Sequence, residues 1–277
     1  MEKNVLVVIG VGGMGLAIAR RCGSGKKVIL ADFNEQTLAA AAEQLRIEGH
    51  DVTEHRVDVS DLDSVTKLAQ DAAAEGPVLQ VAHTAGLSPV QAPTDAIIKV
   101  DLLGVAYVLD AFAEVIASGG AGVVIASMAG HFAADSVPLE MAKALSLTPT
   151  DQLSELPFLG EGALPNPGAA YSIAKRANAL RVQAAAGVWG QRGARINSIS
   201  PGIISTPMGN AELDGESGQQ MRGMIAASAT GRTGTPDDIA AATAFLLDAQ
   251  QSSFITGTDL LVDGGAVAGV RWHMNAG

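Results

Sequence analysis

Tyr171 and Lys175 are the two residues whose types and spacing best support acid–base chemistry in this sequence. They lie four positions apart, so on a helix both side chains would share one face. A phenol ordinarily titrates near about 10, and a cation held beside it favours the phenolate and lowers that value. Such a pair could act as the general acid/base of an alcohol–carbonyl interconversion. The same spacing also fits a half-buried surface helix, so the surrounding sequence must decide between the two interpretations.

A glycine-rich segment near the N-terminus has the order expected of a dinucleotide-binding turn. Residues 5–9 are a continuous apolar run, typical of a strand buried on both faces of a parallel sheet, and residues 16–21 indicate a helix. Between them, glycines in a G-x-G-x-x-G pattern allow a tight turn and close approach of a pyrophosphate, which the helix N-terminus then binds. We therefore expect cofactor contacts, rather than a simple structural turn, at Gly10, Gly12, Gly13, Met14 and Gly15.

Asp32 ends the predicted second strand, residues 27–32. A carboxylate at this position can accept hydrogen bonds from both ribose hydroxyls and would repel a 2′-phosphate. The next two residues, Phe33 and Asn34, supply no cation. The pattern favours NAD over its 2′-phosphorylated form, while a strand-end Asp can also simply cap the helix that comes next.

Strand and helix patterns alternate along the whole chain, which predicts an α/β fold. We expect a single domain, residues 1–277, with a Rossmann-type doubly wound parallel sheet of about seven strands and the site at their carboxyl ends. Ser127 lies at such an end. Beyond the first two, the predicted strands are residues 55–59, 78–83, 123–126 and 194–199, and residues 260–265 form a seventh strand and its turn. The other predicted elements are an apolar helix at 100–117, a helix at 168–189 that carries Tyr171, and a polar flap at about 205–230.

Composition excludes several classes of function. Eighteen basic against 29 acidic residues give a net charge of −11, which disfavours nucleic acid or an anionic membrane as a partner and favours a cytoplasmic protein. The single Cys22 excludes an intrachain disulfide, and the five histidines show no metal-ligand spacing, so we expect no metal site. We find no targeting segment and no apolar run suited to a membrane span.

Taken in this order, the motifs resemble the short-chain dehydrogenase/reductase family over about residues 5–265. Further matches are the adenine-pocket pair Asp58-Val59, the Ala85-Gly86 turn, Asn197 through Pro201-Gly202, Thr206, and residues 262–265. The resemblance implies a hydride transfer between NAD and a secondary alcohol or ketone, with an apolar small molecule as substrate.

The resemblance also implies a role for each site residue. Tyr171 would be the catalytic acid/base, Ser127 would hydrogen-bond the substrate oxygen, and Lys175 would hold the nicotinamide ribose and lower the pKa of Tyr171. Ile204 and Thr206 would contact the amide and phosphate side of the nicotinamide. The remaining implied cofactor contacts are Phe33, Asp58, Val59, Thr84, Ala85, Gly86, Pro201 and Gly202.

Several positions depart from the family pattern. The glycine loop is one residue shorter than usual, with Ile9 in place of a Thr, and His83-Thr84 replaces the usual Asn residues before Ala85. Asp101 stands where the family's fourth catalytic residue, an Asn, usually lies. It would organise the proton-relay water as a charge rather than as an amide.

An insertion of about residues 133–167 separates Ser127 from Tyr171, with helix-like pieces at 139–147 and 149–156. A similar insertion occurs in the bacterial 3α-hydroxysteroid dehydrogenase/carbonyl reductase branch. Family members commonly pair the helices equivalent to 100–117 and 168–189 between subunits. We therefore expect a homotetramer or homodimer, with the insertion beside both the active-site mouth and a subunit contact.

Two other functions are compatible with a dinucleotide fold. One is an epimerase or dehydratase that retains its NAD, although 277 residues leave little room for the larger substrate lobe of those enzymes. The other is a non-catalytic NAD-binding sensor or scaffold, which the presence of Ser127, Tyr171 and Lys175 argues against.

Overall fold

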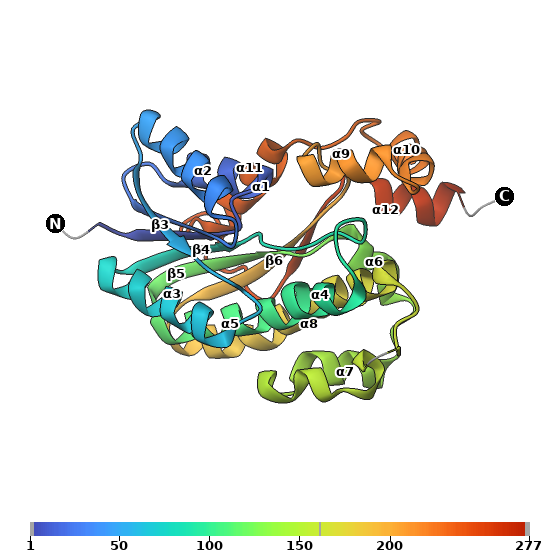
Figure 1. Cartoon of the computed structure of the whole chain (residues 1–277), viewed down its shortest axis with the longest axis horizontal. Helices are drawn as coiled ribbons and strands as arrows, with labels where there is room; N and C mark the ends of the chain where they lie inside the picture. The colour runs from blue at the N-terminus through green and yellow to red at the C-terminus, as the bar shows by residue number, and fades with distance from the viewer. Residues whose placement is uncertain (1–2, 161, 275–277) are drawn as a thin grey trace.

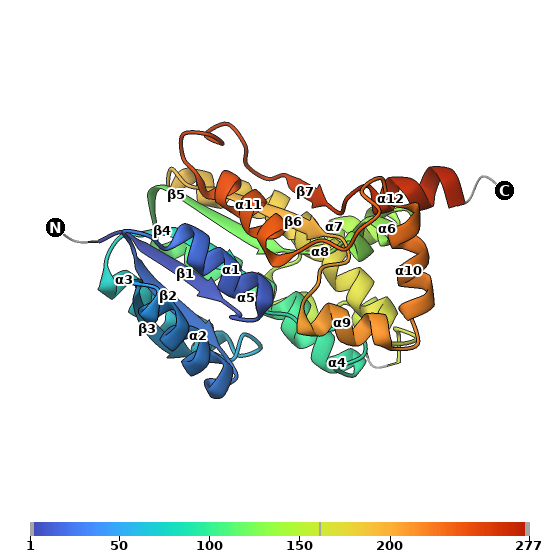
Figure 2. The ribbon, with the colours of Figure 1, turned by 90° about the horizontal axis from the view of Figure 1, so that it is seen from above.

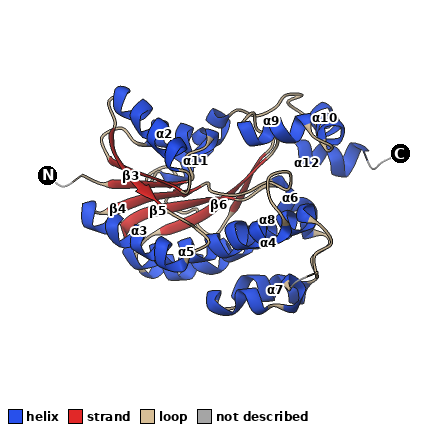
Figure 3. Cartoon of the chain, viewed as in Figure 1, coloured by secondary structure: helices blue, strands red, loops and turns tan. Residues whose placement is uncertain are grey.

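Seven parallel strands form the centre of the protein in a computed structural model that describes residues 3–160 and 162–274. Helices cover both faces of the sheet, giving three layers (Figures 1 and 3). Across the sheet the order is β3 (Asp51–Arg56), β2 (Lys27–Asp32), β1 (Val5–Ile9), β4 (Val78–His83), β5 (Ile116–Ile125), β6 (Arg195–Pro201) and β7 (Asp259–Val262). The predicted doubly wound α/β fold is confirmed.

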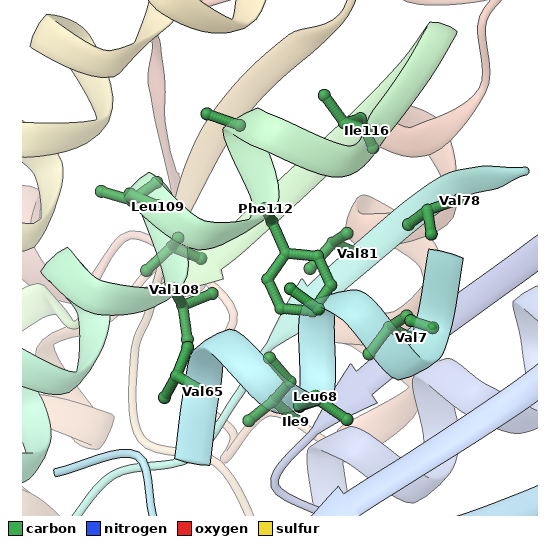
Figure 4. Packing of buried hydrophobic residues seen from close by; sticks show 14 of the residues in the cluster. Val7, Ile9, Val65, Leu68, Val78, Val81, Val108, Leu109, Phe112 and Ile116 are labelled. Atoms are coloured by element: carbon green, nitrogen blue, oxygen red, sulfur yellow. The ribbon is translucent and has the colours of Figure 1, made fainter. Parts of the chain in front are cut away.

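The two faces of the sheet bury separate apolar clusters. Val7 and Ile9 of β1 pack on one face, and Leu6 and Val8 on the other, as the two-residue repeat of a strand requires. Figure 4 shows the first face, where Phe112 packs among side chains of the sheet and of a neighbouring helix. This explains why β1 is apolar throughout: neither of its faces meets water.

Each face has its own set of helices. The helices α1 (Gly13–Cys22), α2 (Glu35–Ile47) and α11 (Pro236–Leu247) cover one face, and α3 (Leu62–Glu75), α5 (Gly104–Val115) and α8 (Pro167–Gln191) cover the other (Figure 1). The strand order reverses at β1: β2 and β3 are added on one side of it, and β4 to β7 on the other. The carboxyl ends of these central strands therefore form the crevice in which such folds bind ligands.

Some element bounds differ from the predicted ones. β3 spans Asp51–Arg56 rather than 55–59, because this edge strand pairs along the length of β2, with Lys27 opposite Asp51 and Asp32 opposite Arg56. The side chains of β3 are mostly polar, so the apolar pattern placed the strand over the buried residues Val57 and Val59 that come after it. The predicted helix 100–117 starts earlier and ends earlier: α4 (Thr94–Ile97), a π-helical segment η1 (Ile98–Leu103) and α5 join over 94–115, and β5 begins at Ile116, seven residues before the predicted strand 123–126.

The insertion packs against helices of the main domain. It comes after α6 (Met128–Ala134) and contains α7 (Leu139–Leu147), as predicted, but the second piece is 3₁₀-helical, in η2 (Thr150–Glu155) and η3 (Pro157–Leu159). Residue 161 of the predicted insertion lies outside the described residues. Leu145 and Leu153 are fully buried against η1, α5 and α8. Most of its other apolar residues also pack there, but Leu139 and Leu147 of α7 are 68% and 70% exposed.

The predicted flap folds as two helices, α9 (Pro207–Asp214) and α10 (Gly218–Ala227). Together with α12 (Ala266–Gly269) and η4 (Val270–Met274) they gather beyond the carboxyl ends of the strands (Figure 2). Among the described residues, no helix is both long enough and apolar enough to cross a membrane.

Candidate active site

Tyr171 and Lys175 lie on the first turns of α8, which Asn166 caps by accepting a hydrogen bond from the Ala169 N–H at 2.9 Å. The Lys175 Nζ atom lies 5.4 Å from the centre of the Tyr171 ring, and Lys175 is only 4% exposed. Burial raises the pKa of the Tyr171 phenol, while the Lys175 charge and a hydrogen bond with Ser127 lower it. The net pKa is above the usual phenol value, so Lys175 acts in the predicted direction but does not outweigh burial.

Ser127 reaches this pair because α6 crosses α8 in direct contact. It comes just after β5 and caps α6, its Oγ accepting a hydrogen bond from the Ala129 N–H at 3.1 Å. A Cβ at Gly130 would lie 2.8 Å from backbone atoms of Lys175 and Arg176, so only glycine allows the two helices to approach this closely. The predicted trio is thereby brought together from two helices.

Asp101 joins the trio from the π-helical segment. Its Oδ2 lies 3.2 Å from Lys175 Nζ, its Oδ1 accepts a hydrogen bond from the Leu87 N–H at 2.7 Å, and the residue is fully buried. A Cβ added to Gly86 would lie 3.2 Å from Lys175 Nζ, so this turn closes over the ion pair. Burial raises the pKa of Asp101 while Lys175 lowers it. Burial lowers the pKa of Lys175, but Asp101 and Tyr171 together raise it above its ordinary value. π-Helical turns are frequent at functional sites.

The glycine loop has the shape of a pyrophosphate cradle. Gly10 adopts φ +87°, and a Cβ there would lie 2.4 Å from the Ala85 nitrogen; a Cβ at Gly15 would lie 1.9 Å from the Gly10 oxygen. Gly12 instead faces open space, and a Cβ at Gly13 would meet Thr206 at 3.1 Å. The N-terminus of α1 thus opens onto a space that side chains would fill, which fits a bound dinucleotide.

The strand ends around this loop hold the other predicted cofactor residues. The Thr84 hydroxyl donates to the Gly10 carbonyl at 2.6 Å and so supports the turn where the family has Asn. Asp58 Oδ1 accepts hydrogen bonds from the Ser60 N–H and hydroxyl, and Val59 packs beneath Gly104. At the end of β6, Pro201 leads into residues that line a cavity of about 190 Å³, among them Gly202 and Ile204.

Asp32 lies beside the glycine loop, and the strand next to it carries a cation, Arg56. Asp32 Oδ2 accepts a hydrogen bond from the Val11 N–H at 2.8 Å, which ties the end of β2 to the glycine loop. Arg56 lies opposite Asp32 in the sheet, and its guanidinium carbon is 5.0 Å from the centre of the exposed Phe33 ring. The residues after Asp32 supply no cation, as expected, but the neighbouring strand carries Arg56, whose Nε lies 3.5 Å from Glu35 Oε1.

Comparison with known proteins agrees with this geometry. A sequence profile described as short chain dehydrogenase matches residues 3–139, and one described as enoyl-(acyl carrier protein) reductase matches residues 157–267. The short-chain dehydrogenase/reductase bsc3 of Alternaria brassicicola is 41% identical over 268 residues, or 97% of each chain. The chain belongs to the short-chain dehydrogenase/reductase family.

Other relatives of this short-chain dehydrogenase/reductase include a member of the hydroxysteroid branch that the sequence resembles. The 3-alpha-hydroxysteroid dehydrogenase/carbonyl reductase of Comamonas testosteroni is 30% identical over 191 residues, 68% of this chain and 72% of that protein. The solved structure of gox2181 shares the fold, with a TM-score of 0.76 at 24% identity, and 97% of both chains is covered. The family uses a nicotinamide cofactor and its members are oxidoreductases.

Two polar groups of this short-chain dehydrogenase/reductase site, Glu212 and His83, were not among the predicted site residues. Glu212 of α9 is partly buried, which raises its pKa; the nearby Ser88 side chain lowers it, and the Glu212 charge raises the pKa of Tyr171. His83 of β4 is fully buried with neither ring nitrogen hydrogen-bonded, and burial and Lys175 lower its pKa to about 3. Nothing in the sequence around Glu212 distinguishes it from other polar residues of the flap.

A third missed feature anchors the helix that begins at Ser127. His131 Nε2 lies 2.7 Å from Asp259 Oδ2 on β7, and Ser200 donates to the same carboxylate at 2.8 Å. The Arg271 guanidinium donates to the His131 carbonyl at 2.9 Å. These residues are distant in sequence, so only the folded chain shows that they position α6.

Proposed function

We propose that this protein is an NAD-dependent oxidoreductase that interconverts a secondary alcohol and a ketone, with Tyr171 as the general acid/base. The observation that carries the proposal is that Ser127, Tyr171 and the buried Lys175 meet at the sheet edge where the glycine loop opens. NAD would be held along Gly10–Gly15 and beside Asp32, and when bound it supplies the hydride chemistry.

The side chains divide the remaining work. Tyr171 gives its phenolic proton to the substrate oxygen in reduction and takes it back in oxidation. Ser127 donates a hydrogen bond to the same oxygen, where negative charge develops, and a donor already in place costs no reorganisation during the reaction. The Lys175 ammonium stabilises the phenolate form of Tyr171. Because Lys175 is buried and Tyr171 is half-buried, the Lys175 charge acts in a medium with little screening by water.

Two alternatives keep the same cofactor site. An NAD-retaining epimerase or dehydratase would show no net change of nicotinamide absorbance with substrate, and a sensor or scaffold would bind NAD without turnover. A panel of ketones and secondary alcohols, monitored at the reduced-nicotinamide absorbance band, separates all three. The steroid and carbonyl activities named for the Comamonas testosteroni relative make cyclic and apolar ketones the first members of that panel.

We expect NAD to bind at least about tenfold more tightly than its 2′-phosphorylated form. The Asp32 carboxylate would face the added phosphate, and a tenfold ratio requires only about 1.4 kcal/mol of repulsion. Isothermal titration with both cofactors measures the ratio. Asp32→Ala combined with Phe33→Arg should move the preference toward the phosphorylated form. Arg56→Ala is the matched control: it should leave the NAD preference in place, whereas equal affinities in the unmodified protein would contradict Asp32 as the discriminating group.

We also propose a homo-oligomer, tetramer or dimer, whose contacts depend on the insertion. Arg181 of α8 donates to the carbonyl oxygens of Leu145 and Thr148, so the insertion is bound to a helix that the family commonly uses between subunits. Replacing residues 133–167 with a short Gly-Ser loop should therefore change the mass measured by light scattering or the kinetics for bulky substrates. Unchanged assembly together with unchanged kinetics would contradict a role for the insertion in either.

A further inference from the structure

Lys175 is bound by a carboxylate through direct contact. Asp101 Oδ2 lies 3.2 Å from the Nζ atom, and the other carboxylate oxygen is held by the Leu87 N–H at 2.7 Å. The two side chains are 0% and 5% exposed, so water screens their attraction little. One oxygen is thus hydrogen-bonded to the backbone and the other pairs with the ammonium group by charge alone, so the anchored carboxylate holds the ammonium group beside it.

The groups that act on the pKa of Tyr171 come from four parts of the chain, and three of them carry a charge. Lys175 on α8 is the cation; Asp101 on η1 and Glu212 on α9 are carboxylates, and Ser127 before α6 is a neutral donor. His83 on β4, which faces Lys175, stays neutral at physiological pH because burial and Lys175 lower its pKa to about 3. One cation therefore favours the phenolate form of Tyr171, and two carboxylates disfavour it. The nearer carboxylate touches the cation itself, so the phenolate form of Tyr171 gains less from Lys175 than it would from an unpaired ammonium.

We propose that Asp101 is the counter-ion of Lys175 and a positioning residue that sets the pH at which Tyr171 becomes a base. It keeps the ammonium group in place and weakens the stabilisation that this group gives to a Tyr171 phenolate. Alcohol oxidation, which needs the phenolate, is thereby moved to more alkaline pH, and ketone reduction, which needs the phenol, continues to higher pH. This catalytic consequence rests on the proposed function; the charge relation between Asp101 and Tyr171 does not.

The titration of Tyr171 tests the proposal without any turnover. The chain has only two tyrosines, so Tyr107→Phe leaves Tyr171 as the single phenol seen in an ultraviolet difference titration. Adding Asp101→Asn, which keeps an oxygen for the Leu87 N–H, should lower the midpoint by about one pH unit. At a fixed pH below both midpoints the phenolate fraction should rise about tenfold. Asp95→Asn, which removes an exposed carboxylate from α4, should leave the midpoint unchanged.

An unchanged or higher midpoint in Asp101→Asn overturns the proposal. Should that variant not fold, Asp101→Ser removes the same charge and carries the same expectation. The pH profile of alcohol oxidation then separates this proposal from the proposed function: its alkaline rise should move down by the same unit as the titration. A titration that moves while the profile does not supports the counter-ion and contradicts Tyr171 as the general base.

Discussion

Replacing Tyr171 with Phe should reduce turnover by about 10²–10⁴-fold, the range typical of a lost general acid/base. The substitution keeps the ring that packs against Lys175 and removes only the transferable proton. Cofactor affinity should therefore survive, since the phenyl ring still fills the space in front of α8. Steady-state kinetics gives the first quantity and isothermal titration with NAD the second.

Tyr107→Phe is the matched control, because it makes the same chemical change at the only other tyrosine of the chain. Tyr107 packs partly buried on α5, away from the glycine loop, and its variant should keep normal turnover. Near-normal turnover in Tyr171→Phe, with the control also normal, would refute the acid/base assignment. A large loss in both variants would point to packing of the α5 and α8 helices instead.

Lys175→Met should damage turnover, cofactor binding and stability together. Removal of the ammonium withdraws charge stabilisation from Tyr171, and it leaves the fully buried Asp101 carboxylate without its ion-pair partner. Breaking one side of a buried pair typically costs about 3–5 kcal/mol. We expect at least about a 10²-fold loss of turnover, weaker NAD binding, and a lower thermal midpoint in calorimetry.

The double variant Lys175→Met/Asp101→Asn separates these effects. Neutralising the stranded carboxylate should recover most of the lost stability but none of the lost turnover, because the two losses have different origins. Lys67→Met, at a lysine whose side chain is 73% exposed, controls for the loss of a cation and should change neither quantity. If the double variant is as unstable as Lys175→Met alone, the destabilisation does not come from the unpaired carboxylate.

Features encoded locally in the sequence could be predicted well. The glycine loop needs only its own residues and the flanking strand and helix, and Tyr171 and Lys175 share a face because a single helix carries them. Ser127 could be placed because the end of a strand in a parallel sheet marks the ligand edge. The seven-strand sheet could be predicted from the same alternation, since buried parallel strands are apolar throughout.

Features that depend on two distant segments could not be predicted. Arg56 reaches the Asp32 end only through the register of β2 with β3, and the edge strand that carries it has too few apolar residues to be located correctly. The His131–Asp259 contact and the position of Glu212 likewise arise from packing. The net direction of the Tyr171 pKa shift could not be predicted either. The sequence shows the neighbouring Lys175, but the burial of the phenol depends on packing.

The π-helical segment Ile98–Leu103 also fixes the angular phase between α4 and α5. Each residue of an α-helix advances by about 100°, so a turn that holds one residue more rotates the helix before it by about that angle relative to the helix after it. The loss of one residue here could be absorbed as an ordinary helical turn, leaving Phe112 packed on the sheet. A deletion between Asp101 and α5 would turn Asp101 away from Lys175 and would also turn Ile97 of α4 out of its buried cluster. Chain length in this segment is thus constrained by the position of the Asp101 carboxylate as well as by packing.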